Sequence, residues 1–293
     1  MNVLSLFDGC SGARLALVRA NKKVDQYFTC EIDKYAQQVT KLNFPDSTML
    51  GDVTKVNFEM LPKIDLLIGG SPCQDLSFAK GNGKGLEGER SGLFYKYFEA
   101  LEVLRKKNPE IKFLLENVKM KKEWENIITG LLGVTPVMIN SADFSAQNRQ
   151  RLYWTNIPID THSVSRKNYK DIKETDAADN YYYSPKMLAW IDRHGKRKNK
   201  KLRIQSDDDK VQMIEASHFK GCSSQRYFGI EDTKGLRYIT VKETERAQTV
   251  PDNYTRCGQK DDGEIVLISN TQRYKMLGNG FTINVIAHIL KNL

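Results

Sequence analysis

The sequence predicts an α/β protein built on a doubly wound, mostly parallel sheet, and three observations support this prediction. Apolar segments of strand length alternate with segments of helical period over the first half of the chain. The apolar runs are nearly continuous, as in "IDLLIGG" (64–70) and "IKFLLENV" (111–118), which is typical of strands covered on both faces. Glycine or acidic residues follow several of these runs, at the strand ends where such sheets bind ligands.

The elements follow one another in the order that this fold requires. We expect strands at 2–7, 26–32, 47–53, 64–70, 111–118, 135–144 and 151–157, and helices at 12–20, 34–43, 93–108, 122–132 and 282–293. From 158 to 236 the chain is polar and irregular in pattern, with an acidic triplet at 207–209 and a helix start within "NYYYSPKMLAWI" (180–191). We therefore expect a main domain formed by 1–157 and 237–293, with a small irregular region at 158–236.

Composition excludes several classes of protein. Of the 293 residues 40% are hydrophobic, yet there is no apolar run long enough to cross a membrane. The chain starts with a strand pattern rather than a secretory leader, so we expect a cytoplasmic protein. Five scattered cysteines form no Cys-x-x-Cys pair, which argues against a disulfide scaffold and against a metal site. They are Cys10, Cys30, Cys73, Cys222 and Cys257.

The charge balance favours a polyanionic partner. The formal net charge is +9, and the run "RHGKRKNKKLR" (193–203) holds seven Lys or Arg and no acid. Two interpretations of this run stay open: a solvated loop, and a loop that contacts phosphates through Lys198, Lys200 and Lys201.

Three features at successive strand ends indicate a nucleoside ligand. The turn "LFDGCSG" (6–12) joins the first strand to a helix through glycines, which allow close approach of the backbone to a ligand. Glu31 ends the second strand, where a carboxylate accepts hydrogen bonds from ribose hydroxyls. Asp52 ends the third strand, where it is placed to accept a hydrogen bond from the amino group of a base. The turn lacks a complete G-x-G-x-x-G, so a dinucleotide is not implied.

Four motifs carry a resemblance to a known family. They are "GGSPCQDLS" (69–77), "LLENV" (114–118), "QNRQR" (147–151) and "LGNG" (277–280). In this order they resemble the motifs of the DNA cytosine-5 methyltransferases. The resemblance is to the bacterial or phage type, and it implies the Rossmann-like fold of this class of enzymes. Ser71, where most bacterial members have proline, is similar to the animal de novo branch of the family.

The resemblance implies catalytic residues for methyl transfer to C5 of a cytosine flipped out of double-stranded DNA. Cytosine C5 is a poor nucleophile, and addition of the Cys73 thiolate to C6 would make it enamine-like. Glu116 would contact N3 and the exocyclic amine, while Arg149 and Arg151 would orient this glutamate and hold the O2 edge and a nearby phosphate. Gln74 and Ser77 would contact the DNA, and the glycine-rich 80–92 would close over the flipped base.

The same resemblance implies S-adenosylmethionine as the methyl donor. Phe7 would stack on its adenine, Glu31 would bind the ribose and Asp52 the adenine amine. The full set implied for the cofactor is Phe7, Asp8, Gly9, Ser11, Gly12, Glu31, Ile32, Asp52, Val53, Pro72, Leu93 and Asn279. Two departures from the family pattern are Ser11, where glycine is usual, and Gly280–Phe281, where small or β-branched residues are usual.

The region 158–236 matches none of the four motifs, and we expect it to read the target site. Within it "GCSSQRY" (221–227) is the preferred reader, through Gln225 and Arg226, against the alternative of an ordinary polar turn. After it, Glu243 and Arg246 match a framing segment of the family, and a helical ion pair between them is compatible with this match.

Alternative functions follow from the same residues. One branch of the family methylates a transfer RNA, but its Cys-Phe-Thr signature is not found here. A catalytically dead homologue predicts loss of Cys73, Glu116 or one of the arginines, and all of them are present. We expect a monomer, and a companion restriction endonuclease is compatible with the sequence.

Overall fold

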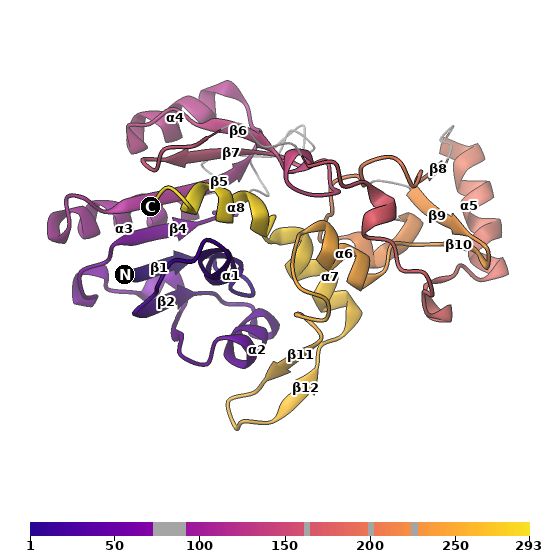
Figure 1. Cartoon of the computed structure of the whole chain (residues 1–293), viewed down its shortest axis with the longest axis horizontal. Helices are drawn as coiled ribbons and strands as arrows, with labels where there is room; N and C mark the ends of the chain where they lie inside the picture. The colour runs from indigo at the N-terminus through magenta and orange to yellow at the C-terminus, as the bar shows by residue number, and fades with distance from the viewer. Residues whose placement is uncertain (73–91, 161–164, 199–201, 224–227) are drawn as a thin grey trace.

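A computed structural model describes residues 1–72, 92–160, 165–198, 202–223 and 228–293. Its larger part is a sheet covered by helices, and its smaller part carries α5 (Pro185–Lys198) with three short strands (Figure 1). Between them lie α6 (Val241–Ala247) and α7 (Asn270–Asn279). The hairpin of β11 (Cys257–Gln259) and β12 (Ile265–Leu267) projects from the same side of the molecule as α2 (Lys34–Asn43).

The large sheet confirms the predicted fold class. Its strands are β1 (Asn2–Leu6), β2 (Gln26–Cys30), β3 (Thr48–Gly51), β4 (Leu66–Gly69), β5 (Lys112–Val118), β6 (Val137–Asn140) and β7 (Gln150–Thr155). Their order is β3-β2-β1-β4-β5-β7-β6, with the first five parallel and β7 antiparallel to both neighbours. The chain therefore changes direction across the sheet between β1 and β4, which is where such sheets bind ligands.

Helices cover both faces of this sheet, as the apolar strands require. They include α1 (Gly12–Arg19), α2 (Lys34–Asn43), α3 (Leu93–Lys107), α4 (Lys122–Leu132) and α8 (Ile283–Leu290). Alternate β1 residues divide between the two faces: Val3 packs in the core that includes α1 and α8, and Leu4 packs in the core under α3 and α4. Arg19 Nη donates to Asn284 Oδ1 at 2.7 Å, so the first helix is also joined to the last.

The expectation of an irregular region at 158–236 is only partly right. A helix, α5, follows the aromatic "YYYSP" as expected, but a three-stranded sheet is also present, formed by β8 (Arg203–Ile204), β9 (Phe228–Asp232) and β10 (Gly235–Arg237). The first six residues of the basic run belong to the end of α5, so the expectation of a loop is wrong for 193–198. Lys198 is the last residue of that helix, and Lys200 and Lys201 lie outside the described residues.

One segment of this region is bound along the "QNRQR" motif. Val211 N–H donates to the Ala146 carbonyl at 2.7 Å, and Ile214 N–H donates to Gln147 Oε1 at 2.7 Å. Both apolar side chains are completely buried in the core that also holds α1 and α8. The segment from Val211 to Ile214 is therefore packed in the same core as α1 and α8, although the sequence around it is polar.

Glu243 does not pair with Arg246, so the helical ion pair that their spacing permits is not formed. Its carboxylate instead pairs with the completely buried Arg237, at 2.8 and 2.9 Å, and also accepts the Tyr169 hydroxyl at 2.8 Å. Arg246 pairs with Asp252 at the partly exposed end of α6. The cluster of Glu243, Arg237 and Tyr169 thus fastens α6 to β10 and to the start of the 158–236 region.

Arg237→Met is expected to lower the free energy of unfolding by about 3–5 kcal/mol, because Glu243 would remain as a buried charge without its partner. Arg246→Met is the matched control and is expected to cost at most about 1 kcal/mol, since its ion pair is partly exposed. Urea unfolding of both variants measures the difference. Equal losses would mean that the Arg237 pair contributes no more than a surface pair.

Candidate active site

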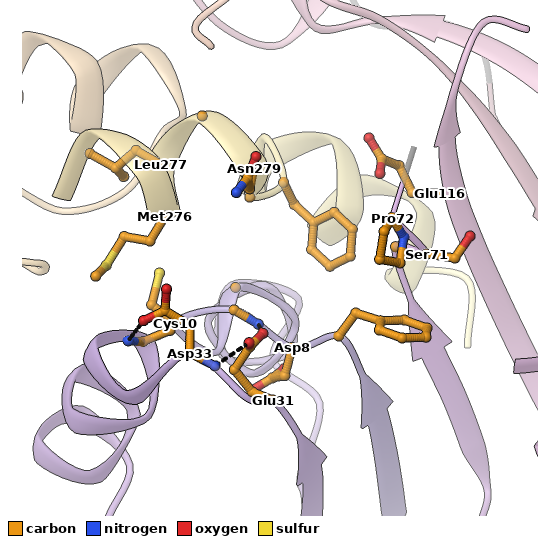
Figure 2. A pocket seen from close by; sticks show the side chains of 18 of the residues that line it. Asp8, Cys10, Glu31, Asp33, Ser71, Pro72, Glu116, Met276, Leu277 and Asn279 are labelled. Carbon is orange, nitrogen blue, oxygen red and sulfur yellow. Dashed lines mark hydrogen bonds between the residues drawn. The ribbon is translucent and has the colours of Figure 1, made fainter. Parts of the chain in front are cut away.

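A cavity of about 450 Å³ opens at the carboxyl ends of the parallel strands. It is lined by residues that follow β1, β2, β3 and β4, by the end of β5, and by the C-terminal end of α7. Figure 2 shows Asp8 and Glu31 on one side, Met276, Leu277 and Asn279 opposite, and Pro72 with Glu116 at one end. The cavity therefore lies at the switch point predicted from the strand order.

The loop after β1 has an unusual backbone conformation. Phe7, Gly9 and Ser11 have φ angles of 58°, 60° and 60°, in the left-handed region that is costly for residues other than glycine. The buried Asp8 carboxylate holds this loop by accepting hydrogen bonds from the hydroxyls of Ser5, Ser11 and Tyr27 at 2.5–2.7 Å. Burial raises the pKa of Asp8 above its ordinary value, and these hydrogen bonds oppose that rise.

Ser11 has a backbone conformation that favours glycine, the residue that the resemblance predicts at this position. A φ of 60° suits glycine without strain, whereas serine needs compensating contacts. The Ser11 hydroxyl donates to Asp8 at 2.7 Å and lies 2.9 Å from the Thr40 hydroxyl. Ser11 is completely buried and is not among the residues that line the cavity, so its part is to hold the loop.

The Glu31 carboxylate is fixed by three backbone N–H groups. It accepts from Gly9 through one oxygen and from Ile32 and Asp33 through the other, each at 2.8 Å. Its pKa is raised by burial, against the lowering effect of these bonds. Because a carboxylate offers about four acceptor positions, one is left for a ligand hydroxyl in the cavity.

At the next strand end, one carboxylate oxygen of Asp52 has no hydrogen-bond partner among the described residues. Its Oδ1 accepts the N–H and the hydroxyl of Thr54 at 2.9 and 2.8 Å, and these bonds lower the pKa of Asp52 below its ordinary value. The group is therefore ionised at neutral pH. Both Asp52 and the following Val53 line the cavity.

Glu116 and Arg151 form an ion pair at the other end of the cavity. Arg151 Nε lies 2.9 Å from Glu116 Oε1, and both side chains are about nine-tenths buried. Strand register makes the two residues diagonal neighbours. Arg151 of β7 lies opposite Val118, two residues from Glu116 on β5, and Tyr153 lies opposite Glu116 itself. A Cβ atom at Gly70 would lie only 3.1 Å from Glu116 Oε2, so the absence of a side chain there leaves room for the carboxylate.

Arg149 contacts backbone carbonyls of two other segments. Its guanidinium donates to Ile214 at 2.8 Å, and to Gly278 and Gly280 at 3.2 and 3.1 Å. The backbones come so close that a Cβ atom at Gly278 would lie 2.1 Å from the Ala216 nitrogen. Arg149 therefore joins the "QNRQR" motif to the 158–236 region and to the end of α7, and its predicted contact with the substrate stays a prediction.

A second side chain of the "LLENV" motif supports the strand end that precedes Cys73. Asn117 Nδ2 donates to the Ser71 hydroxyl oxygen at 2.9 Å, and both side chains are buried. Ser71 thus offers an acceptor that proline, usual here in bacterial members, would lack. Cys73, Gln74 and Ser77 themselves lie outside the described residues, as do 80–91, Gln225 and Arg226.

Comparison with known proteins identifies the family. The family model for C-5 cytosine-specific DNA methylases matches residues 1–182 and 159–293. The chain belongs to this family. Its reaction is the S-adenosylmethionine-dependent methylation of cytosine C5 in DNA, and the transfer RNA alternative is not favoured.

Individual relatives agree with this identification. The chain is 31% identical to Type II methyltransferase M1.ScrFI of Lactococcus lactis subsp. cremoris, over 99% of this chain and 77% of that protein. It is 27% identical to Type II methyltransferase M.HhaI of Haemophilus parahaemolyticus, over 100% and 94%. The solved structure of the Entamoeba histolytica methyltransferase EhMeth has a TM-score of 0.75 at 17% identity, covering 100% of this chain and 97% of that one, which shows a shared fold.

In this DNA cytosine-5 methylase, the cavity gathers predicted cofactor residues from the whole length of the chain. All of the predicted set except Ser11 line it: Phe7, Asp8, Gly9, Gly12, Glu31, Ile32, Asp52, Val53, Pro72, Leu93 and Asn279. Sequence reasoning did not single out Tyr254, Lys275 and Met276, which also line the cavity. The proximity of Met276 to the "LGNG" motif is the one signal in the sequence that could have found it.

In the described part of the methylase, no group of three or more His, Cys, Asp or Glu residues could hold a metal ion. None of the helices described is long and apolar enough to cross a membrane. Cys10 and Cys30 line the cavity, but burial raises the pKa of each thiol to about 12, so neither is a nucleophile at neutral pH.

Proposed function

We propose that this cavity binds S-adenosylmethionine and that its Glu116 end receives the flipped-out cytosine. The observation that carries the proposal is that one cavity contains both the carboxylates of Glu31 and Asp52 and the Glu116–Arg151 ion pair. A nucleoside site and a base-activating site are therefore next to each other, as methyl transfer between two bound molecules requires. The volume of about 450 Å³ lies within the range of roughly 300–1,000 Å³ that is usual for cofactor pockets.

The chemistry of the lining residues fits the methyl donor. The remaining acceptor position of Glu31 suits a ribose hydroxyl, and the free oxygen of Asp52 suits the adenine amine. Phe7 offers an aromatic ring for the adenine to stack on. The first turn of α1 has no side-chain cap. Its backbone N–H groups therefore suit hydrogen bonds to the carboxylate in the methionine part of S-adenosylmethionine.

The reaction assigns separate roles to Cys73, Glu116 and Arg151. The Cys73 thiolate forms a bond to C6, and the electron pair of the C5–C6 double bond moves toward C5 and N3. The Glu116 carboxyl group passes a proton to N3 and accepts a hydrogen bond from the exocyclic amine, and Arg151 holds this carboxyl group in place. Bound S-adenosylmethionine would supply the electrophilic methyl group to C5 and would leave as S-adenosylhomocysteine. Loss of the C5 proton to water then lets the C5–C6 double bond form again as the bond between sulfur and C6 breaks, and the N3 proton returns to Glu116.

DNA recognition is proposed for the region 158–236. It carries sixteen Lys or Arg against twelve acids, and its helix α5 leads into the basic run. Contacts with phosphates by Lys198, Lys200 and Lys201, and base reading by Gln225 and Arg226, stay predictions. The names of the Type II relatives support a companion restriction endonuclease with the same recognition sequence.

Glu31→Ala tests the cofactor site. The variant is expected to raise the dissociation constant for S-adenosylmethionine by about 10- to 100-fold, because hydrogen bonds to a charged acceptor are lost. Glu99→Ala, on the exposed side of α3, is the control and is expected to bind like the wild type. Isothermal titration calorimetry measures both dissociation constants, and an unchanged value for Glu31→Ala would place the donor elsewhere.

A further inference from the structure

The strained loop between β1 and α1 needs support from outside itself. Two residues other than glycine, Phe7 and Ser11, hold left-handed conformations, each at a cost on the order of 1–2 kcal/mol. Contacts from within the first forty residues oppose this cost, through Asp8, Glu31 and Thr40. Such a loop keeps its shape only when the surrounding structure fixes it, so each further contact with it affects the cavity.

One such contact comes from the far end of the sequence. The Tyr254 hydroxyl donates a hydrogen bond of 2.7 Å to the carbonyl of Cys10, in the middle of the loop. Tyr254 itself lines the cavity and packs against Cys10, Val39 and Met276. Burial raises the pKa of Tyr254 well above its ordinary value, so the hydroxyl stays protonated and remains a donor.

The position of Tyr254 is fixed by a buried carboxylate. Glu245 of α6 accepts the N–H of Asn253 at 2.7 Å and the N–H of Thr255 at 3.0 Å, on either side of the tyrosine. Glu245 is completely buried and pairs with Arg273 of α7 at 3.0 Å. The turn that carries Tyr254 is therefore held rigidly by α6 and α7, which makes it a firm anchor for the loop.

We infer that Tyr254 is a positioning residue for the methyl donor. Its hydroxyl holds the Cys10 carbonyl, and so keeps the loop from Phe7 to Gly12 in the conformation that binds the ligand. This inference rests on the proposed function of the cavity. Because Tyr254 acts on the binding loop and not on the cytosine, its loss should weaken binding of the donor and leave the chemical step intact.

Tyr254→Phe removes only the hydroxyl and tests the inference. We expect the dissociation constant and the KM for S-adenosylmethionine to rise by about fivefold to tenfold, as for one lost hydrogen bond. The kcat at saturating donor should stay within about twofold of the wild-type value, and the KM for DNA should not change. Tyr238→Phe is the matched control: it removes a hydroxyl that donates to a backbone carbonyl, that of Asn180, away from the cavity. This control should leave the dissociation constant and the KM for S-adenosylmethionine, the kcat and the KM for DNA unchanged.

Hydrogen exchange of the ligand-free protein supplies a readout that does not depend on activity. Amides of the loop from Phe7 to Gly12 should exchange faster in Tyr254→Phe, while those of β1 should not. Unchanged loop exchange, or wild-type affinity for the donor, would overturn the inference, provided that Glu31→Ala weakens binding. If Glu31→Ala also binds like the wild type, it is the proposed cavity itself that is wrong. If kcat fell by the same factor as the KM for S-adenosylmethionine rose, the variant would have a general structural defect, and this result would also overturn the inference.

Discussion

Cys73→Ala is expected to abolish methyl transfer, with a loss of at least about four orders of magnitude in the single-turnover rate. The covalent route through C6 is lost, and C5 of an unactivated cytosine is too poor a nucleophile to replace it. Affinity for S-adenosylmethionine should stay within about threefold, because the variant leaves the predicted donor contacts in place. Cys257→Ala is the matched control: this partly exposed free thiol lies on β11 and should be dispensable.

DNA that contains 5-fluorocytosine tests the covalent bond itself. Fluorine at C5 cannot leave as a proton, so the adduct between Cys73 and C6 should accumulate and survive denaturing gel electrophoresis. The wild type and Cys257→Ala should both give the shifted band, and Cys73→Ala should give none. A band that persists in Cys73→Ala would assign the nucleophile to another residue.

Glu116→Gln is expected to slow the single-turnover rate by about 100- to 1,000-fold while DNA affinity falls by no more than about threefold. Glutamine still forms hydrogen bonds with the bound base, but it cannot pass a proton to N3 when the thiolate adds to C6. It also breaks the buried ion pair with Arg151. Single-turnover rates and DNA dissociation constants measured on the same preparations separate the two effects.

Arg151→Lys is the companion variant for the glutamate. It keeps the positive charge but loses the Nε donor that lies 2.9 Å from the Glu116 carboxylate. We expect an intermediate loss of rate, on the order of tenfold, with DNA affinity close to that of the wild type.

An equal loss of single-turnover rate and of DNA affinity in Glu116→Gln would contradict this account of the glutamate. The carboxyl group would then serve mainly to bind the base.

Periodicity and the strand-end rule account for the parts of the molecule that sequence predicted well. The bounds of α2 and α4 are those expected. The N-cap Asp33 marks the start of α2, and Gly133 in the left-handed conformation marks the end of α4. Glu31, Asp52 and Glu116 were assigned to strand ends, and a parallel sheet brings its strand ends to one edge. Their presence in one cavity therefore follows from the order of elements alone.

Contacts that depend on three-dimensional packing were out of reach. The strands β8 to β10 have two to five residues each, too few to show a period. The spacing of Glu243 and Arg246 permits an ion pair, but Glu243 lies on the buried side of α6, where it pairs with Arg237. The hydrogen bond from Tyr254 to Cys10 joins residues 244 positions apart, and no local pattern in the sequence reports such a contact.

The most direct measurement is bisulfite sequencing of plasmid DNA and of transfer RNA from cells that express the protein, next to cells that express Cys73→Ala. We expect cytosines protected from conversion at one recurring DNA sequence, only with the wild type, and no new protected cytosine in transfer RNA. Complete conversion of the DNA, or protection confined to transfer RNA, would contradict the assignment of this chain as a DNA cytosine-5 methyltransferase.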